Sequence, residues 1–484
     1  MRLIAQFCTS INCHPMTRFK AVKELANADE ETLAFIEEVS SAGLFDDREP
    51  VVVTRAPGRL DVMGGIADYS GSLVLQLPIA DATYVALQKS ESRTLRIRSE
   101  KTRSIEIDLH NFDGPVEYVA ARALFTKAEN HWAAYVAGVF LVLMREKNTQ
   151  FEKGASLLIH STVPEGKGVA SSAALEVAVM QAVTAAFGIE MDCLELATLC
   201  QKVENLVAGA PCGIMDQMTS ACGEENRLLE LLCQPDQLRG ALGIPDELEL
   251  WGVDSGVRHA VSGSDYTAVR TAAFMGYRIV ADLAGLRVTP NEAGKVSIED
   301  PRWKGYLANI TPVEFDENYL GALPEMIKGD LFLSRYQGIT DTVTSVQRES
   351  EYPVRQATRH AVYENTRVQS FAAMLKNWQG IESAPDLGQL MFESHQSYSD
   401  CGLGADPTDL IVDLVRNSAA DDLFGARITG GGSGGTVAIL GRASARAAIE
   451  KLAMRFSEQT GYKPIIFSGS SPGACKFSHV RLKL

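Results

Sequence analysis

The stretch PEGKGVASSAAL, residues 164–175, decides the fold class, because it places a glycine-rich loop between an apolar strand and a helix. The run Leu157–Ile159 predicts the strand, Pro164 ends it, and the helix is expected to begin near Ser171. Glycines let the loop turn its backbone amides inward, and the helix adds the positive end of its dipole. This order of elements predicts an oligophosphate site.

Two observations narrow the meaning of this loop. Gly168 follows Lys167 where a Walker A loop has Ser or Thr, so the segment is not a Walker A loop. Two roles stay open for Lys167, contact with a phosphate and simple solvation. A helix cap with a flexible approach is the alternative to phosphate binding.

A second glycine-rich run, residues 429–435, formally satisfies the dinucleotide fingerprint G-x-G-x-x-G. That fingerprint follows a strand and opens a helix, whereas the residues after this run, Thr436–Leu440, are strand-like. We therefore do not interpret it as a nicotinamide site. Close approach of the backbone to a ligand and a tight β-turn both explain so many glycines.

Charged residues stand at two further breaks in the pattern. We expect a short strand, Val51–Val53, to run into a turn over Arg55–Arg59, so that residues 59–69 carry a guanidinium and carboxylates. Glu204 and Asp216 flank the helix break 208–213, which can fold both carboxylates into one cavity. Carboxylate oxygens suit Mg²⁺ and a base for a hydroxyl nucleophile. Surface ion pairs and solvated acids are the alternatives.

Composition excludes several classes of protein. The chain has 484 residues, 46% hydrophobic and 22% charged, which predicts a globular protein with two large lobes. A net charge of −15 disfavours nucleic acid and anionic membrane surfaces as partners. The longest apolar run, Trp132–Met144, is shorter than the ~20 residues of a membrane span. Leu3–Phe7 is too short for a signal-peptide core, so we expect a cytoplasmic protein.

The nine cysteines do not form a disulfide or zinc pattern. Cys8, Cys13 and His14 cluster but do not complete a tetrahedral site, so reduced thiols are expected. Nothing in the sequence indicates an oligomeric state.

The remaining pattern divides the chain into three parts. Residues 1–48 are expected to form a leader helix region, with helical spacing over 18–45, packed on an N-terminal lobe of residues 49–230. A C-terminal lobe follows over 231–484. Within it we expect helices over 303–364, 357–375 and 387–414, a loop and strand over 426–440, and strands over 465–484.

Together these motifs resemble the GHMP small-molecule kinases, and within them the galactokinase branch, from about Val51 onward. Residues 56–59, 166–174 and 429–435 resemble the three family motifs in order, and 211–217 and 264–266 resemble galactokinase segments. The resemblance implies a two-lobed α+β fold that binds ATP, Mg²⁺ and a sugar in the cleft between the lobes.

The resemblance also implies a role for each site residue. Asp216 would act on the sugar C1 hydroxyl, Arg59 would neutralise charge on the transferred phosphoryl group, and Ser172 with Glu204 would hold Mg²⁺. Asp68, Gly213 and Tyr266 would contact the sugar. The expected nucleotide contacts are Trp132, with Tyr135 beside it, Gly166, Lys167, Gly168, Val169, Ala170, Ser171, Ser172, Gly431 and Gly432.

Two departures from the galactokinase pattern predict the substrate. Galactokinases have Glu-His where this chain has Gly65 and Ile66, and that pair reaches the C6 hydroxymethyl of galactose. L-Arabinopyranose has the same hydroxyl stereochemistry and no C6, so we expect Gly65 and Ile66 to line the space where that group would lie. Residues 394–404 also lack the galactokinase pattern, and with 59–69 they resemble the kinase domain of plant L-arabinokinases.

The sequence thus predicts an ATP-dependent sugar 1-kinase, with L-arabinose as substrate. A galactokinase whose specificity is held elsewhere is the nearest alternative. A non-catalytic, galactokinase-like sugar sensor is another, although a sensor needs no base such as Asp216. A nicotinamide oxidoreductase rests on the 429–435 run alone.

Overall fold

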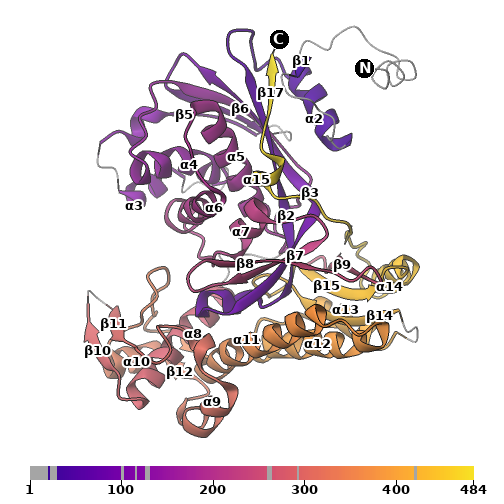
Figure 1. Cartoon of the computed structure of the whole chain (residues 1–484). Coiled ribbons are helices and arrows are strands. Elements are labelled where there is room, and N and C mark those ends of the chain that lie inside the picture. Colours follow the sequence, from indigo (N-terminus) through magenta and orange to yellow (C-terminus); the bar gives the residue numbers. More distant parts are fainter. Residues whose placement is uncertain are drawn as a thin grey trace.

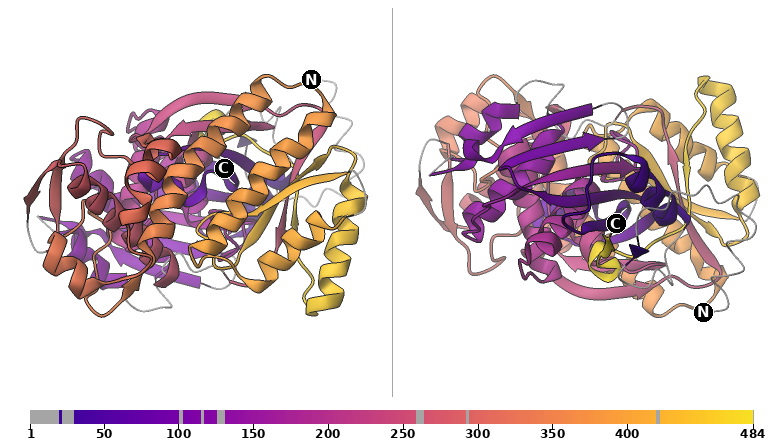
Figure 2. Two further views of the ribbon diagram at one scale, coloured as in Figure 1. Left: turned by 90° about the horizontal axis from the view of Figure 1, so that it is seen from below. Right: turned by 90° about the horizontal axis from the view of Figure 1, so that it is seen from above.

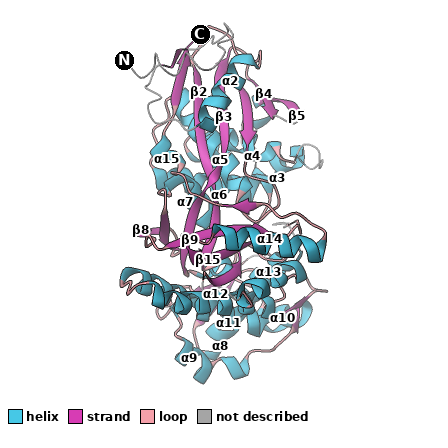
Figure 3. Ribbon diagram, turned by 90° about the vertical axis from the view of Figure 1, so that its right-hand side faces the viewer, coloured by secondary structure: helices cyan, strands magenta, loops and turns pink. Residues whose placement is uncertain are grey.

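The computed structural model describes residues 20–21, 30–99, 103–114, 117–125, 131–258, 264–291, 294–418 and 422–483. Over these ranges the chain forms two lobes, each built on its own β-sheet (Figures 1 and 3). The two-lobed α+β fold predicted from the sequence is confirmed. The Cys8, Cys13 and His14 cluster lies outside the described residues, as do most positions before Glu30.

The N-terminal lobe holds a sheet that has nine strands among the described residues, in the order β1-β17-β2-β3-β6-β4-β5, with β7 paired to β3 and to β8. Only the pair of β4 and β6 is parallel among the described strands. The strands are β1 Lys20–Ala21, β2 Val51–Met63, β3 Leu73–Ser90, β4 Thr94–Ser99, β5 Arg103–Asp108, β6 Gly154–Ser161, β7 Arg227–Leu232, β8 Gln237–Gly243 and β17 Val480–Lys483.

Helices cover both faces of this sheet. Alternate residues of a strand point to opposite faces, so Val85 and Leu157 face the large core under most of the helices, while Tyr84 and Leu158 face helix α2, Glu30–Ser41. The covering helices on the large-core side are α3 Tyr118–Arg122, α4 Ala133–Glu146, α5 Ser171–Phe187, α6 Cys193–Lys202 and α7 Met215–Cys222.

The C-terminal lobe is built on a four-stranded antiparallel sheet, β14-β15-β9-β16. The long helices α11 and α12 lie across this lobe when it is seen from below (Figure 2). Its main elements are β9 Leu248–Asp254, α8 Ser264–Leu283, α11 Val354–Lys376, α12 Ala384–Asp400, α13 Asp406–Arg416, β14 Leu423–Ile428, β15 Thr436–Arg442, α14 Arg446–Thr460 and β16 Ile466–Phe467.

The first motif is not a turn, and that part of the sequence prediction is wrong. Strand β2 continues from Val51 through Pro57 and Gly58 to Met63. The pairing of β2 with β3 shifts register between Pro57 and Arg59. This irregularity allows Pro57, which has no backbone N–H to donate, to lie within the strand. Arg59 therefore projects from a strand and not from a turn.

The segment 303–364 is not the long helical stretch that its few glycines suggest. It contains the short helices α9, Pro312–Asn318, and α10, Gly329–Tyr336, and a two-strand pair of β12, Ile327–Lys328, with β13, Glu351–Tyr352. Prolines at 312, 324 and 353 interrupt helical hydrogen bonding. Just before this segment, β10, Arg287–Pro290, pairs with β11, Val296–Glu299. The helices near 357–375 and 387–414 are present as α11, α12 and α13, with a break after Asp400.

The chain changes sheet between β8 and β9, after Gly243, so we place the lobe boundary there rather than near residue 230. The C-terminus then returns to the first lobe, where helix α15, Ala474–Phe477, precedes β17. A disulfide joins Cys193 to Cys475, and the Cys222 sulfur lies 2.7 Å from that of Cys193. The expectation that all thiols are reduced does not match this pairing, which joins residues too distant in sequence to show a spacing pattern. In the described part of the chain, no helix combines the length and apolar character needed to cross a bilayer.

Candidate active site

A cleft of about 960 Å³ lies where the two lobes meet. Its lining comes from both lobes: from β2, the loop before α5, the break before α7, helix α8 and the loop between β14 and β15. The predicted site residues that line the cleft are Arg59, Ile66, Asp68, Trp132, Gly166, Gly168, Ala170, Ser171, Ser172, Glu204, Gly213, Asp216, Tyr266 and Gly431. Gly65, Lys167, Val169 and Gly432 are absent from the lining.

The phosphate-loop segment has the backbone that its glycines predict. Gly166 and Gly168 both have φ of 72°, Ala170 is left-handed with φ of 59°, and α5 begins at Ser171. The second glycine run packs against this loop, since a Cβ atom at Gly435 would lie 3.0 Å from the Lys167 carbonyl oxygen. The hydroxyl of Thr436, the residue after the run, donates to the same carbonyl over 2.7 Å. That run connects two antiparallel strands and opens no helix, in agreement with our rejection of a dinucleotide fingerprint.

Lys167 has neither of the two roles that the sequence left open. Its ammonium group pairs with the fully buried carboxylate of Asp254 at 2.9 Å and lies over the ring of Tyr462. The side chain therefore faces away from the cleft, and only the backbone of Lys167 belongs to the loop. The side chain of Arg258, which the sequence analysis did not single out, lines the cleft beside Gly166 instead.

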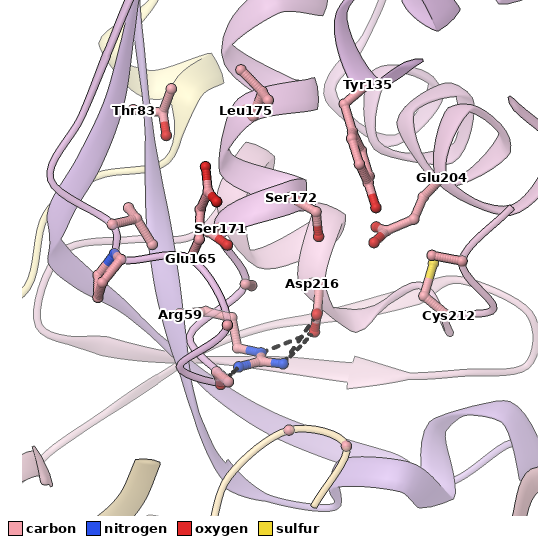
Figure 4. A pocket seen from close by; sticks show the side chains of 18 of the residues that line it. Arg59, Thr83, Tyr135, Glu165, Ser171, Ser172, Leu175, Glu204, Cys212 and Asp216 are labelled. Carbon is pink, nitrogen blue, oxygen red and sulfur yellow. Dashed lines mark hydrogen bonds and ion pairs between the residues drawn. The ribbon is translucent and has the colours of Figure 1, made fainter. Parts of the chain in front are cut away.

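Arg59 and Asp216 form a two-point ion pair in the cleft (Figure 4). Arg59 Nε donates to Asp216 Oδ1 over 2.9 Å and Nη2 to Oδ2 over 3.0 Å, while Nη1 donates to the Gly168 carbonyl over 2.6 Å. The side chain of Arg59 is 3% exposed and that of Asp216 is 20% exposed. The guanidinium thus fixes the aspartate next to the phosphate loop while leaving it accessible from the cleft.

Glu204 lies on a π-helical turn, Val203–Ala208, and its carboxylate faces Ser172 (Figure 4). The Ser172 hydroxyl is hydrogen-bonded to it, and Gln217 Nε2 donates to Glu204 Oε2 over 2.6 Å. Burial raises the pKa of Glu204 to about 7, and the hydrogen bond from Ser172 opposes that rise. The two oxygen-bearing side chains expected at a magnesium site are therefore together.

A third cluster of residues lines the cleft around Asp68. Asp68 and Tyr266 line it, and a Cβ atom at Gly213 would collide with the Asp68 carboxylate, so only glycine leaves room there. Burial raises the pKa of Asp68 to about 7, the charge of Asp216 adds to the rise, and the Arg270 guanidinium opposes it.

Arg270 is a residue of this cluster that the sequence analysis missed. It is 5% exposed, donates to both carboxylate oxygens of Asp341 at 2.9 and 3.0 Å, and donates to the Cys212 carbonyl over 3.1 Å. Its guanidinium also lies 5.3 Å from the centre of the Tyr69 ring. Arg270 stands one helical turn after Tyr266 in α8, a spacing that puts both on one helix face and was the available signal.

One predicted position has surroundings other than those expected. Gly65 faces the buried side chains of Tyr398, Arg427 and Asp61, so the expectation that it lines the sugar space is not met. Trp132 and Tyr135 both line the cleft as expected, and the Tyr135 hydroxyl points toward the Glu204 carboxylate (Figure 4).

Three sequence families match the chain. The GHMP kinases N terminal domain matches residues 134–224, the GHMP kinases C terminal domain matches 372–458, and the galactokinase galactose-binding signature matches 42–89. The chain thus contains the N- and C-terminal domains of GHMP kinases. Residues from both domains meet in one cleft.

The chain is 43% identical to the L-arabinokinase of Arabidopsis thaliana over 92% of its own length, and it spans 48% of that protein. It is 29% identical to the galactokinase of Chloroflexus aggregans, over 89% of this chain and 95% of that protein. The predicted resemblance to the galactokinase branch and to L-arabinokinases is confirmed.

Solved structures show the same fold. Lactococcus lactis galactokinase complexed with galactose matches with a TM-score of 0.71 at 22% identity, covering 93% of this chain and 100% of that one. Methanococcus jannaschii mevalonate kinase matches with a TM-score of 0.54 at 13% identity, covering 87% and 98%. The GHMP kinase fold predicted from the motifs is therefore confirmed.

The raised pKa of Asp68 leads to a prediction for the ligand-free protein. Folding raises this pKa from 3.8 to about 7, so the folded chain binds more protons than the unfolded chain between these values, and ionisation lowers stability as the pH rises through that window. Asp68→Asn removes this loss. We expect its melting temperature, relative to the wild type, to rise from about pH 4 to pH 7 and then level off, while calorimetry shows weaker sugar binding. If the difference in melting temperature between Asp68→Asn and the wild type does not vary with pH, the pKa of Asp68 is not raised by folding.

Proposed function

We propose that this chain transfers the γ-phosphoryl group of ATP to the anomeric C1 hydroxyl of a monosaccharide, and that its sugar is L-arabinose, giving L-arabinose 1-phosphate. The observation that carries the proposal is the Arg59–Asp216 ion pair, which stands between the phosphate loop and the Asp68 cluster. This position would place the Asp216 carboxylate in the same cleft as ATP and the sugar. The name of the Arabidopsis relative supports L-arabinose as the sugar.

Asp216 and Arg59 divide the work of the transfer. The C1 oxygen bonds to the γ-phosphorus, the bond from that phosphorus to the β,γ-bridging oxygen breaks, ADP leaves, and the C1 hydroxyl proton passes to Asp216 Oδ. Arg59 holds the Asp216 carboxylate at two points and places positive charge beside the Gly168 carbonyl, where the phosphate loop begins to turn into α5. Positioning and charge stabilisation supply most of the acceleration in phosphoryl transfer.

Ser172 and Glu204 would hold Mg²⁺. Their hydroxyl and carboxylate oxygens are the ligands that this hard cation prefers, and among the described residues no group of three His, Cys, Asp or Glu side chains offers a denser metal site. An ion held there would neutralise charge on the phosphates of ATP.

Glu204→Gln should therefore raise the magnesium concentration needed for half-maximal activity more than it raises the sugar KM. We expect a shift of at least the ~10-fold that loss of an outer-sphere partner costs a metal site. Glu195→Gln, on the exposed side of α6 next to Lys147, is the matched control. A magnesium titration that superimposes on that of the wild type would place the ion elsewhere.

L-Arabinose fits the Asp68 end of the cleft better than galactose does. The Ile66 side chain lines the cleft there and is 1% exposed within an apolar cluster. A hydroxymethyl hydroxyl beside it would lose its water partners without gaining a protein partner, at a cost of about 1–3 kcal/mol. We infer in addition a cytoplasmic location, where ATP is abundant.

The test is to incubate the chain with ATP, Mg²⁺ and single aldoses, and to identify the products by ³¹P NMR. We expect an anomeric phosphate from L-arabinose. Absence of phosphate transfer to every sugar, with calorimetric sugar binding retained, would favour the non-catalytic sensor. NADH fluorescence titration tests the oxidoreductase alternative, and we expect no binding.

A further inference from the structure

Tyr398 on α12 contacts two residues of the cleft lining without lining the cleft itself. Its side chain is fully buried, and its hydroxyl makes two hydrogen bonds. It accepts from the Ile66 N–H over 2.8 Å and donates to the Gly430 carbonyl over 2.9 Å. Ile66, on the 3₁₀ turn Gly65–Ser70, and Gly430 both line the cleft, so one phenol group joins that turn to the second glycine run.

The same hydroxyl occupies the space next to Gly65. A Cβ atom at Gly65 would collide with Tyr398 Oη, and it would lie 2.8 Å from both Arg427 Nη2 and Asp61 Oδ2. Gly65 also has φ of 46°, a conformation that favours glycine. The lack of a side chain at position 65 is thus coupled to the presence of a hydroxyl at position 398.

The surrounding groups hold Tyr398 in place. Arg427 and Asp61 form a fully buried ion pair at 2.9 Å, with the guanidinium 5.1 Å from the centre of the Tyr398 ring. The ring of His360 stands perpendicular to the phenol ring at a centroid distance of 5.1 Å. The phenol therefore cannot swing aside to admit a side chain at position 65 without disturbing a buried charge pair.

We propose that Tyr398 is a positioning residue that sets the sugar preference: its hydroxyl excludes a side chain at position 65 and holds Ile66 at the cleft, which adapts the site to an aldopentopyranose. The proposal deepens the proposed function and rests on it for the identity of the sugar. It also revises the meaning of the departure at Gly65, because a glutamate introduced there would meet the Tyr398 hydroxyl rather than an open sugar pocket, whereas position 66 does line the cleft.

A double-mutant cycle between Gly65→Ala and Tyr398→Phe tests this coupling. Tyr398→Phe removes the colliding oxygen and keeps the ring. We expect Gly65→Ala alone to lower both kcat/KM for the sugar and the melting temperature, and to have a smaller effect in the Tyr398→Phe background, with a coupling of about 10-fold in kcat/KM. Additive effects within twofold would overturn the proposal. If Gly65→Ala alone does not fold, folding of the double variant supports the coupling. If neither folds, the KM values of Tyr398→Phe alone test the proposal.

Tyr398→Phe by itself separates positioning from general support. Its two partners lie on the Gly65–Ser70 turn and on the second glycine run, so KM should rise for both sugar and ATP, by about 10-fold for the sugar. Tyr277→Phe is the matched control, because that buried hydroxyl donates to Asp300 over 2.7 Å outside the cleft lining. Equal KM values in wild type and Tyr398→Phe, or the same KM changes in the control, would overturn the positioning role.

The sugar panel keeps the two proposals distinguishable. A wild type that prefers D-galactose would end the pentose assignment, while the Gly65 and Tyr398 coupling in melting temperature would still stand or fall by itself. For a wild type that prefers L-arabinose, the galactose-to-arabinose ratio of kcat/KM should rise more for Gly65→Glu, Ile66→His and Tyr398→Leu together than for the first two alone. Equal ratios would overturn the assignment of specificity to Tyr398.

Discussion

Asp216→Asn should lower kcat by about 10²–10⁴-fold while sugar binding persists, because asparagine has nearly the same shape but cannot accept the proton of the C1 hydroxyl. The substitution keeps one oxygen that can accept from Arg59, so the cleft should retain its geometry. Steady-state turnover with ATP and L-arabinose, and calorimetry with the sugar alone, measure the two effects separately.

Asp282→Asn is the control for this experiment. Like Asp216, Asp282 is paired with an arginine: its carboxylate lies 3.4 Å from Arg278, on the same helix. Unlike Asp216, it lies outside the cleft lining. Its kcat should stay within about twofold of the wild type, because the Asp282 carboxylate is exposed and lies outside the cleft lining. Turnover of Asp216→Asn close to that of the wild type would remove Asp216 from the mechanism.

Gly213→Ala should raise the sugar KM by about 100-fold. The added methyl group would collide with the Asp68 carboxylate, and displacement of a substrate-binding group by about 1 Å costs on the order of 10²-fold. Gly243→Ala is the matched control, since a Cβ atom there would meet nothing within 4 Å. An unchanged sugar KM in Gly213→Ala, with normal melting, would show that Asp68 does not bind the sugar.

The parts of the site that were predictable are those encoded in short motifs. Glycines mark the backbone that turns toward a ligand, and the loop before α5 has the left-handed residues that its sequence predicts. The pair of Glu204 and Asp216 was found because a break with Gly209, Pro211 and Gly213 must turn the chain between two acids.

The contacts between distant segments were not predictable from such motifs. Gly65 is near Tyr398, and Lys167 is near Asp254, only because α12 and β9 pack against the first lobe. Arg270 is held in place by an ion pair with Asp341. Asp341 lies in the proline-interrupted segment 303–364, whose secondary structure was predicted wrongly, so this contact could not be foreseen. The first motif was mistaken for a turn because Pro57 and Gly58 usually break strands, whereas here a register shift accommodates them.

Competition between L-arabinose and D-galactose at equal concentrations tests the central claim most directly. With ATP and Mg²⁺ in excess, the initial ratio of the two sugar 1-phosphates, resolved by ³¹P NMR, equals the ratio of the kcat/KM values. The account predicts that L-arabinose 1-phosphate exceeds galactose 1-phosphate by about 10-fold or more, since a hydroxymethyl hydroxyl beside Ile66 would lack a partner. Galactose 1-phosphate as the main product would contradict it.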